Sequence, residues 1–169
     1  MNPITWQLVK KDWHFNKLPM LGYAVLSVVA LVCISLATGV SFYVGSTLLI
    51  TLVVVIGIHM IFVTTIHERS KQNLPFIMSL PITYMQYTRA KLIANIGVFG
   101  LAWLAITVGV IAIVSTSADL PNGFIPFASI ILGELLTANI LILGVAMVTE
   151  SEAWTIVVMA TCNLCISLF

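Results

Sequence analysis

The amino-acid sequence predicts an all-α fold, a polytopic membrane helix bundle with about five transmembrane helices. Three observations predict this class. First, 60% of the 169 residues are hydrophobic and only 8% are charged, whereas a soluble domain carries about 25% charged residues. Second, the mean hydropathy is +1.13, and the apolar residues gather in long stretches. Third, every Lys and Arg lies in one of two polar segments. We therefore expect one transmembrane domain, residues 1–169, in a lipid bilayer.

The same composition excludes other classes. The net charge is only +1, so the chain lacks the basic excess of a nucleic-acid-binding protein and the high charge of a disordered one. The three cysteines, Cys33, Cys162 and Cys165, lie in apolar stretches and suggest no disulfide framework. Cys162 and Cys165 have the spacing of metal ligands, but no third ligand is near them in the sequence, so no metal site is expected.

A spanning helix needs about 20 mostly apolar residues. Five stretches approach or exceed that length: 18–37, 43–66, 92–117, 124–149 and 153–169. The fifth has 17 residues, at the lower limit. Either this helix stops at the outer face or the natural protein continues beyond Phe169, and we favour the second interpretation.

The basic residues predict the orientation. All seven precede the first span or lie between the second and third spans, and the positive-inside rule places such segments in the cytoplasm. The N-terminus is then cytoplasmic, the loop containing Asp119 lies outside, and the turn with Glu150 and Glu152 lies inside. A cleaved signal peptide is not expected, because the first apolar stretch is too long and no cleavage site follows it.

Residues 3–17 are expected to form a separate interfacial helix, which Asn2 caps and Pro3 begins. Trp6, Val9 and Trp13 would form one apolar stripe, and a second stripe would lie beside it. The second stripe consists of Ile4, Leu8, Phe15 and Leu18. Tryptophan and lysine together suit a helix in the headgroup layer. The helix is thus either a simple membrane anchor or a surface whose second stripe contacts a neighbouring protein.

The polar segment 67–91 predicts a short cytoplasmic helix between two prolines. Asn73 can cap this helix, Pro75 fits its first turn and Pro81 ends it. Thr83 and Gln86 have the spacing of a capping box, which would start the helix of the third span. Between the prolines lie four apolar residues that need a cover of lipid or protein. They are Phe76, Ile77, Met78 and Leu80.

The same segment carries a degenerate motif: an acidic–basic pair, a Leu, the run Ser-Leu-Pro-Ile-Thr, and a Lys before the next span. The matching positions are Glu68, Arg69, Leu74, Ser79, Leu80, Pro81, Ile82, Thr83 and Lys91. This pattern resembles the first cytoplasmic loop of ABC-2 type permeases, the membrane-spanning subunits of ATP-binding cassette transporters. The N-terminal helix and the order of spans also fit, so the resemblance covers essentially the whole chain. The family normally has six spans, which agrees with a natural protein that continues beyond residue 169.

The resemblance implies a transport subunit whose cytoplasmic loop forms a coupling helix in a cleft of a separate ATPase subunit. It also implies that two permease copies or homologues pair around the substrate pathway. The residues expected to contact the ATPase are Glu68, Arg69, Leu74, Phe76, Ile77, Met78, Leu80 and Pro81. The sequence contains no Gly-Lys dipeptide and hence no Walker A loop. This chain is therefore expected to be no enzyme and to hold no cofactor, with ATP and Mg²⁺ bound by the partner.

Three polar residues within the spans are candidates for a substrate pathway: Glu134, Asn139 and His59. Glu134 lies about 15 Å into its span, where an ionisable group is costly and suggests a functional site. The alternative is a protonated or hydrogen-bonded Glu134 that holds the bundle together. For His59 an interhelical hydrogen bond is the favoured interpretation. Five glycines are expected at close helix contacts, and these are Gly97, Gly100, Gly109, Gly133 and Gly144.

The sequence thus favours the permease subunit of an exporter in a prokaryotic inner membrane. Two other functions stay open. A non-transporting membrane scaffold would tolerate leucine at Glu134, because it needs no polar pathway. A secondary carrier would show internal repeats, and no convincing repeat is present.

Overall fold

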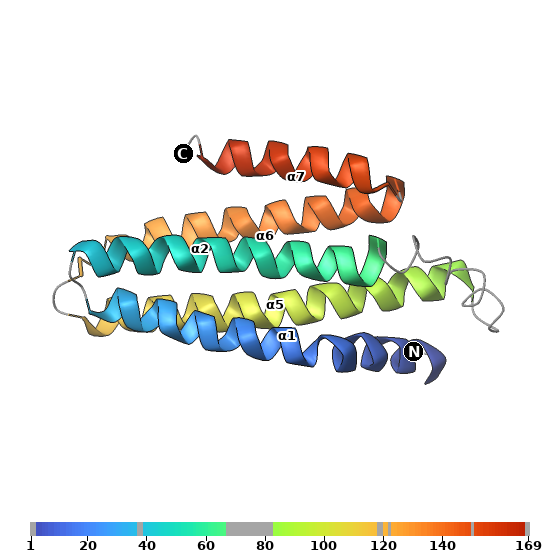
Figure 1. Ribbon diagram of the computed structural model, residues 1–169, viewed down its shortest axis with the longest axis horizontal. Coiled ribbons are helices and arrows are strands. Elements are labelled where there is room, and N and C mark those ends of the chain that lie inside the picture. The colour runs from blue at the N-terminus through green and yellow to red at the C-terminus, as the bar shows by residue number, and fades with distance from the viewer. Residues whose placement is uncertain are drawn as a thin grey trace.

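The computed structural model describes residues 3–36, 39–66, 83–117, 120–121, 123–149 and 151–167. These described residues form five α-helices and one π-helical segment, η1, that continues the second helix. In chain order they are α1 (Pro3–Ser35), α2 (Gly39–Ile61), η1 (Phe62–Ile66), α5 (Tyr84–Thr116), α6 (Phe124–Thr149) and α7 (Glu152–Ser167). The long helices run side by side along one axis (Figure 1), so the predicted all-helical bundle is confirmed.

Four helices in the described part of the chain are long and apolar enough to cross a membrane: Trp6–Ser35, Gly39–Ile66, Met85–Thr116 and Phe124–Thr149. They match the first four predicted spans, and the chain is an integral membrane protein. The fifth predicted span is also a helix, α7, but it has only 16 residues. That length is just below the range of a typical span, which is about 17 to 25 residues.

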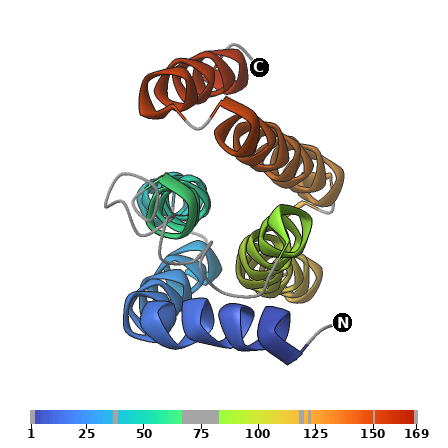
Figure 2. The ribbon, with the colours of Figure 1, turned by 90° about the vertical axis from the view of Figure 1, so that its right-hand side faces the viewer.

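Although the helices run roughly parallel, they are not arranged in a closed ring. In the end-on view α7 packs on α6 at one side, α2 and α5 occupy the middle, and α1 closes the other side (Figure 2). Within an apolar stretch of 18 residues, 56% of the α2 span is buried, against 11% of the corresponding stretch of the α1 span. The second span is therefore the centre of the bundle, and one face of α1 is left free.

The boundary expected between an interfacial helix 3–17 and a span 18–37 is wrong. One continuous helix, α1, covers both ranges with Pro19 inside it. The proline removes a backbone N–H and clashes with the preceding turn, which bends a helix without ending it. Accordingly, the first turns of α1 lie across the end of the bundle toward α5, and the remainder runs along the bundle axis (Figure 2).

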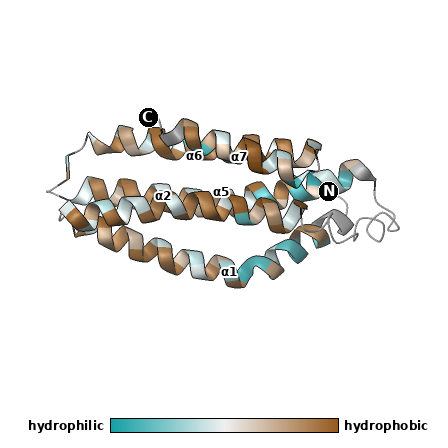
Figure 3. Cartoon of the chain, turned by 45° about the horizontal axis from the view of Figure 1, so that its top comes forward, coloured by the Kyte–Doolittle hydropathy of each residue, from teal (hydrophilic) through white to brown (hydrophobic). Residues whose placement is uncertain are grey.

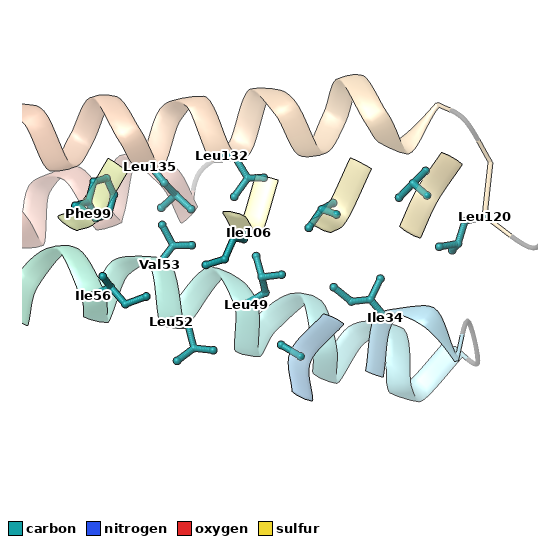
Figure 4. Packing of buried hydrophobic residues seen from close by; sticks show 13 residues of the cluster. Ile34, Leu49, Leu52, Val53, Ile56, Phe99, Ile106, Leu120, Leu132 and Leu135 are labelled. Carbon is teal, nitrogen blue, oxygen red and sulfur yellow. The ribbon is translucent and has the colours of Figure 1, made fainter. Parts of the chain in front are cut away.

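The core lies where α2 meets the other long helices. Val53 of α2 belongs to one buried apolar cluster with residues of three other helices (Figure 4). These include Ile34 of α1, Ile106 of α5, and Leu132 and Leu135 of α6. Lipid tails are as apolar as leucine, so burial from water does not hold such helices together in a membrane. Close van der Waals packing does, and α2 and α5 carry more of the buried apolar residues in this cluster than the other helices do.

Glycine allows close approach at three positions. A Cβ at Gly45 would meet the backbone of α1 at Ala30 and Ile34, 2.9 Å away, and one at Gly109 would meet Leu31 at 2.8 Å. A Cβ at Gly57 would overlap the amide of Asn139. Of the five glycines predicted at such contacts, only Gly109 is confirmed. At the others a Cβ would have no described neighbour within 4 Å, and these are Gly97, Gly100, Gly133 and Gly144.

Polar residues gather at one end of the bundle, in the first half of α1 and the first turns of α5 (Figure 3). We call this the basic end, because it holds five of the basic residues. They are Lys10, Lys11, Lys17, Arg89 and Lys91. Segment 67–82, which carries Arg69 and Lys71, follows η1 and precedes α5 in the chain and lies outside the described residues. The charge separation expected from the sequence is thus present in the fold.

Candidate functional site

A buried ion pair joins α1 to α5 at the basic end. The Nζ atom of Lys91 donates a hydrogen bond to Oδ2 of Asp12 at 2.7 Å, and the two side chains are 1% and 7% exposed. The Lys91 ammonium also lies 5.8 Å from the ring centre of Tyr87, one turn earlier on α5. Lysine and aspartate are almost never buried without a partner. Their pairing therefore fixes how the bent start of α1 sits on α5.

A second polar contact joins α5 to the π-helical segment. Asn95, one turn beyond Lys91 and fully buried, donates from Nδ2 to Oγ1 of Thr64 at 3.2 Å. The Thr64 hydroxyl donates in turn to the carbonyl oxygen of Met60 at 2.6 Å. A π-helical turn inside an α-helix is frequent at functional sites. Here a threonine hydroxyl in that turn donates to a backbone carbonyl of α2 and accepts a bond from the neighbouring helix.

The chain of polar contacts extends to a fourth helix. Thr65, beside Thr64, directs its hydroxyl to the sulfur of Met147 on α6 at 3.8 Å, a weak contact. On α1 the amide of Asn16 donates to the carbonyl oxygen of Asp12 at 2.8 Å. We call these six buried residues the polar cluster. They are Asp12, Asn16, Thr64, Thr65, Lys91 and Asn95. The cluster ties α1, α5, η1 and α6 together where the chain enters segment 67–82.

The first turns of α1 also carry a buried polar face that the sequence patterns did not predict. The residues Asp12 and Asn16 are 5% and 3% exposed, whereas Trp6 and Trp13 are more than half exposed. The exposure of Trp6 and Trp13 is what a stripe that faces the headgroup layer requires, and Asp12 and Asn16 lie on the face toward the bundle. Asp12 stays buried because it pairs with Lys91 of α5, and an unpaired buried lysine would be far more costly.

The residues predicted to contact an ATPase lie outside the described residues. They are Glu68, Arg69, Leu74, Phe76, Ile77, Met78, Leu80 and Pro81. The start of α5 immediately after them is described, and its capping box is confirmed. The Thr83 hydroxyl accepts from the Gln86 backbone N–H at 3.3 Å, and the Gln86 side chain accepts from the Thr83 N–H at 3.2 Å.

The three intramembrane polar residues do not converge on one site. The Tyr23 hydroxyl of α1 lies 3.2 Å from Nδ1 of His59, the kind of interhelical bond expected of this histidine. Asn139 is 8% exposed and packs its amide against Gly57 of α2. Glu134 is half-buried on α6, and no hydrogen bond or ion pair connects it to another described residue. Each of the three therefore has different surroundings.

No local sequence pattern predicted a role for Asp12, Asn16, Asn95 or the two threonines. One sequence signal was available: Asp12 and Lys91 have opposite charges, and each is followed by an asparagine four residues later. Residues four apart share a helix face, so the two pairs form matching polar faces on the first and third spans. Because the partners are far apart along the chain, no pattern within a short stretch of sequence contains both pairs.

No protein-family model, curated protein or solved structure matches this chain. The fold and composition define its class: an integral membrane protein that is a bundle of helices. Among the described residues no group of three His, Cys, Asp or Glu could hold a metal ion. The polar cluster can hold helices in fixed relative positions, because its directional bonds join α1, α5, η1 and α6 near the basic end.

Proposed function

We propose that the chain is the permease subunit of an ABC-2 type transporter, an exporter that forms the substrate pathway and couples to a separate ATPase through segment 67–91. One observation carries the proposal: the motif from Glu68 to Lys91 stands in the sequence between the second and third long helices. ATP and Mg²⁺ belong to the partner, because the chain has no Walker A loop.

The distribution of charge supports the orientation that coupling requires. Lys and Arg accumulate on the cytoplasmic side of membrane proteins, so the basic end faces the cytoplasm of a prokaryotic inner membrane, with the N-terminus on that side. Segment 67–82 and the turn between α6 and α7 then face the same compartment. An ATPase in the cytoplasm would meet the segment that carries the motif.

The polar cluster supports a route for the motion. Segment 67–82 leaves η1 at Ile66 and enters α5 at Thr83, and both flanking elements belong to the cluster. A displacement of this segment by the ATPase would act on α5 and η1 together and, through Asp12 and Thr65, on α1 and α6. Rigid displacement of bonded helices against a partner subunit is an established way to switch a transporter between states. A second permease copy or homologue would supply the other half of the pathway.

Co-purification tests the docking step. Phe76 and Leu80 are changed together to Asp, and binding to the Walker A ATPase encoded beside this chain is measured with both subunits co-expressed. The double variant should lose the ATPase, because two charges replace the apolar contact. Gln72→Asp, which adds charge at a polar position of the same segment, should retain it. Unchanged binding of the double variant, or the lack of an encoded ATPase, contradicts the proposal.

A non-transporting scaffold is the second candidate, and the separation of Glu134, Asn139 and His59 favours it. A pathway usually brings its polar residues together, whereas these three lie against different neighbours. In a scaffold Glu134→Leu would leave activity of the assembled complex unchanged. In a permease the same change should reduce transport. Transport by the reconstituted complex separates the two functions.

A further inference from the structure

A long apolar groove runs between α1 and α5. Its cavity has a volume of about 590 Å³, which is within the usual range of ligand sites, about 300 to 1,000 Å³. Ile56 of α2 closes the back. Along α1 the lining extends from Trp13 to Leu31, a helix length of about 27 Å. That is close to the thickness of the hydrocarbon core, about 30 Å.

The groove exists because α1 and α5 touch at two levels and leave a hollow between them. At the basic end the contact is the Asp12–Lys91 ion pair, and farther along Leu31 packs onto Gly109. The sequence offset between partners is almost the same at both levels, so the two helices run parallel and in register. Between these levels small side chains line the facing surfaces, which keeps the helices from filling the space. They are Ala24, Ser27, Ala102 and Ala105.

The groove opens at the surface of the bundle. Its rim residues Leu21, Val28 and Leu101 are each more than half exposed, so lipid tails can enter from the side. The polar groups inside it are already paired. The Tyr23 hydroxyl bonds to His59 at 3.2 Å, and the Ser27 hydroxyl donates to the Tyr23 carbonyl oxygen at 2.8 Å. The interior therefore offers an apolar wall that suits an acyl chain.

The end of the groove at the basic end has different chemistry. Lys17 lines it together with Trp13 and Asn16. Lys17 is exposed and makes no ion pair within the described chain, and the Trp13 indole N–H has no hydrogen-bond acceptor there. Asn16 is 3% exposed, and its amide makes one hydrogen bond, to the Asp12 carbonyl oxygen. A cation and two further polar groups thus border an apolar channel.

We propose that this groove is a binding site for an anionic glycerophospholipid of the leaflet at the basic end. The phosphate would lie at Lys17, with the indole N–H of Trp13 and the amide of Asn16 beside it, and an acyl chain would fill the channel toward Leu31. Charge complementarity selects the anionic class, because a zwitterionic lipid fills the channel equally well but brings its own cation to Lys17. The inference does not depend on the transport proposal.

Quantitative lipid analysis tests the site. The full chain is extracted from membranes in polymer nanodiscs, and the ratio of phosphatidylglycerol to phosphatidylethanolamine bound to it is compared with that of the bulk membrane. The wild-type protein should be enriched in the anionic lipid. Lys17→Gln should lower the enrichment about fivefold, the effect of one lysine near an anionic headgroup. Lys17→Arg should retain it.

Matched controls separate a site from general surface charge. Lys10→Gln removes an exposed lysine of the same helix outside the groove and should leave the enrichment unchanged. An equal fall for Lys10→Gln and Lys17→Gln, or no enrichment in the wild type, overturns the proposal. Ala102→Phe fills the channel and should abolish enrichment, whereas Ala160→Phe on α7 should not. Helix content and the thermal midpoint are measured for each variant.

A second measurement remains valid if Ala102→Phe does not fold. Phosphatidylglycerol with brominated acyl chains quenches nearby tryptophan, so the fluorescence lost on changing Trp13 to Phe reports lipid at the mouth of the groove. Quenching of that component should be stronger than with brominated phosphatidylethanolamine, and equal quenching overturns the proposal. A second copy of the chain is the other possible occupant. Ready disulfide cross-linking of Leu101→Cys, with Cys33, Cys162 and Cys165 replaced by Ala, would identify it and also overturn the proposal.

Discussion

The Nζ atom of Lys91 lies 2.7 Å from Oδ2 of Asp12, and this pair is buried where the bent start of α1 meets α5. A short charge-assisted hydrogen bond of this kind is directional as well as strong. It fixes the rotation of both helices about two turns beyond the start of α5. The pair thus links the helix that follows the segment proposed to contact an ATPase to the first helix of the bundle.

Removing one partner of this pair should be more damaging than removing both. Lys91→Met leaves the Asp12 carboxylate buried without its main partner and should lower the unfolding free energy by about 3 to 5 kcal/mol. Asp12→Leu combined with Lys91→Met should recover most of that loss, because the buried charge is gone. Unfolding by SDS titration in mixed micelles measures both. Lys10→Met, at an exposed position, should change little, and a double variant as unstable as Lys91→Met would contradict this view.

The contact between Asn95 and Thr64 should show measurable coupling. Interhelical hydrogen bonds in membrane proteins average about 0.6 kcal/mol, with values up to about 1.7 kcal/mol. We expect Thr64→Val and Asn95→Leu each to destabilise the protein, and the double variant to lose less than their sum. A double-mutant cycle by the same titration gives the coupling energy. Additive losses would mean that the 3.2 Å contact contributes nothing.

Replacing a glycine at a helix contact by alanine should lower stability far more than replacing a glycine elsewhere. Gly45→Ala would press on the backbone of α1, which cannot move aside, and should destabilise by about 1 to 3 kcal/mol. A Cβ in Gly57→Ala would overlap the amide of Asn139 and lie 3.3 Å from the Phe99 ring, so combining it with Asn139→Ala should restore part of the lost stability. Gly97→Ala meets no described neighbour and should be neutral or slightly stabilising. Thermal unfolding measures all four variants, and an equal effect of Gly45→Ala and Gly97→Ala would contradict the packing at Gly45.

Glu134 should contribute to transport rather than to stability. It is half-buried and forms no described ion pair or hydrogen bond, so Glu134→Leu removes a carboxyl whose insertion costs about 3 kcal/mol without breaking a contact. The unfolding free energy should stay the same or rise, whereas transport by the reconstituted complex should fall. Thr137→Leu, about one turn after Glu134 on α6, is the control for added side-chain volume. A loss of stability in Glu134→Leu would instead favour a residue that holds the bundle together.

Much of the fold could be predicted from local sequence. Three predicted spans end within a few residues of the C-terminal ends of the observed helices, because apolar length determines where a chain can cross a bilayer. These spans are 43–66, 92–117 and 124–149. The capping box at Thr83 and Gln86 was also recognisable, because it depends on a spacing of three residues. The boundary at residue 17 was wrong because Pro19 bends α1 without ending it, and composition does not distinguish these two effects.

The site was less predictable for a different reason. Asp12 and Lys91 are far apart in the chain, and each alone resembles an ordinary charged residue beside a membrane span. The glycine positions have the same difficulty: Gly57 and Gly144 look alike in sequence, yet only Gly57 faces a neighbouring helix in the described structure. Which face of a helix meets another helix depends on the packing of the whole bundle.

The sequence by itself determined that this protein lies in a membrane, that its long apolar segments are helices, and that its positive charge concentrates at one end. These properties depend on composition and on patterns of a few residues. Only the tertiary structure decided that Asp12 faces Lys91, that His59 and Asn139 serve separate helix contacts, and that α1 and α5 separate to form a groove. These features depend on which faces of distant helices meet, and in a lipid solvent that choice follows from side-chain packing and polar pairing rather than from hydrophobicity.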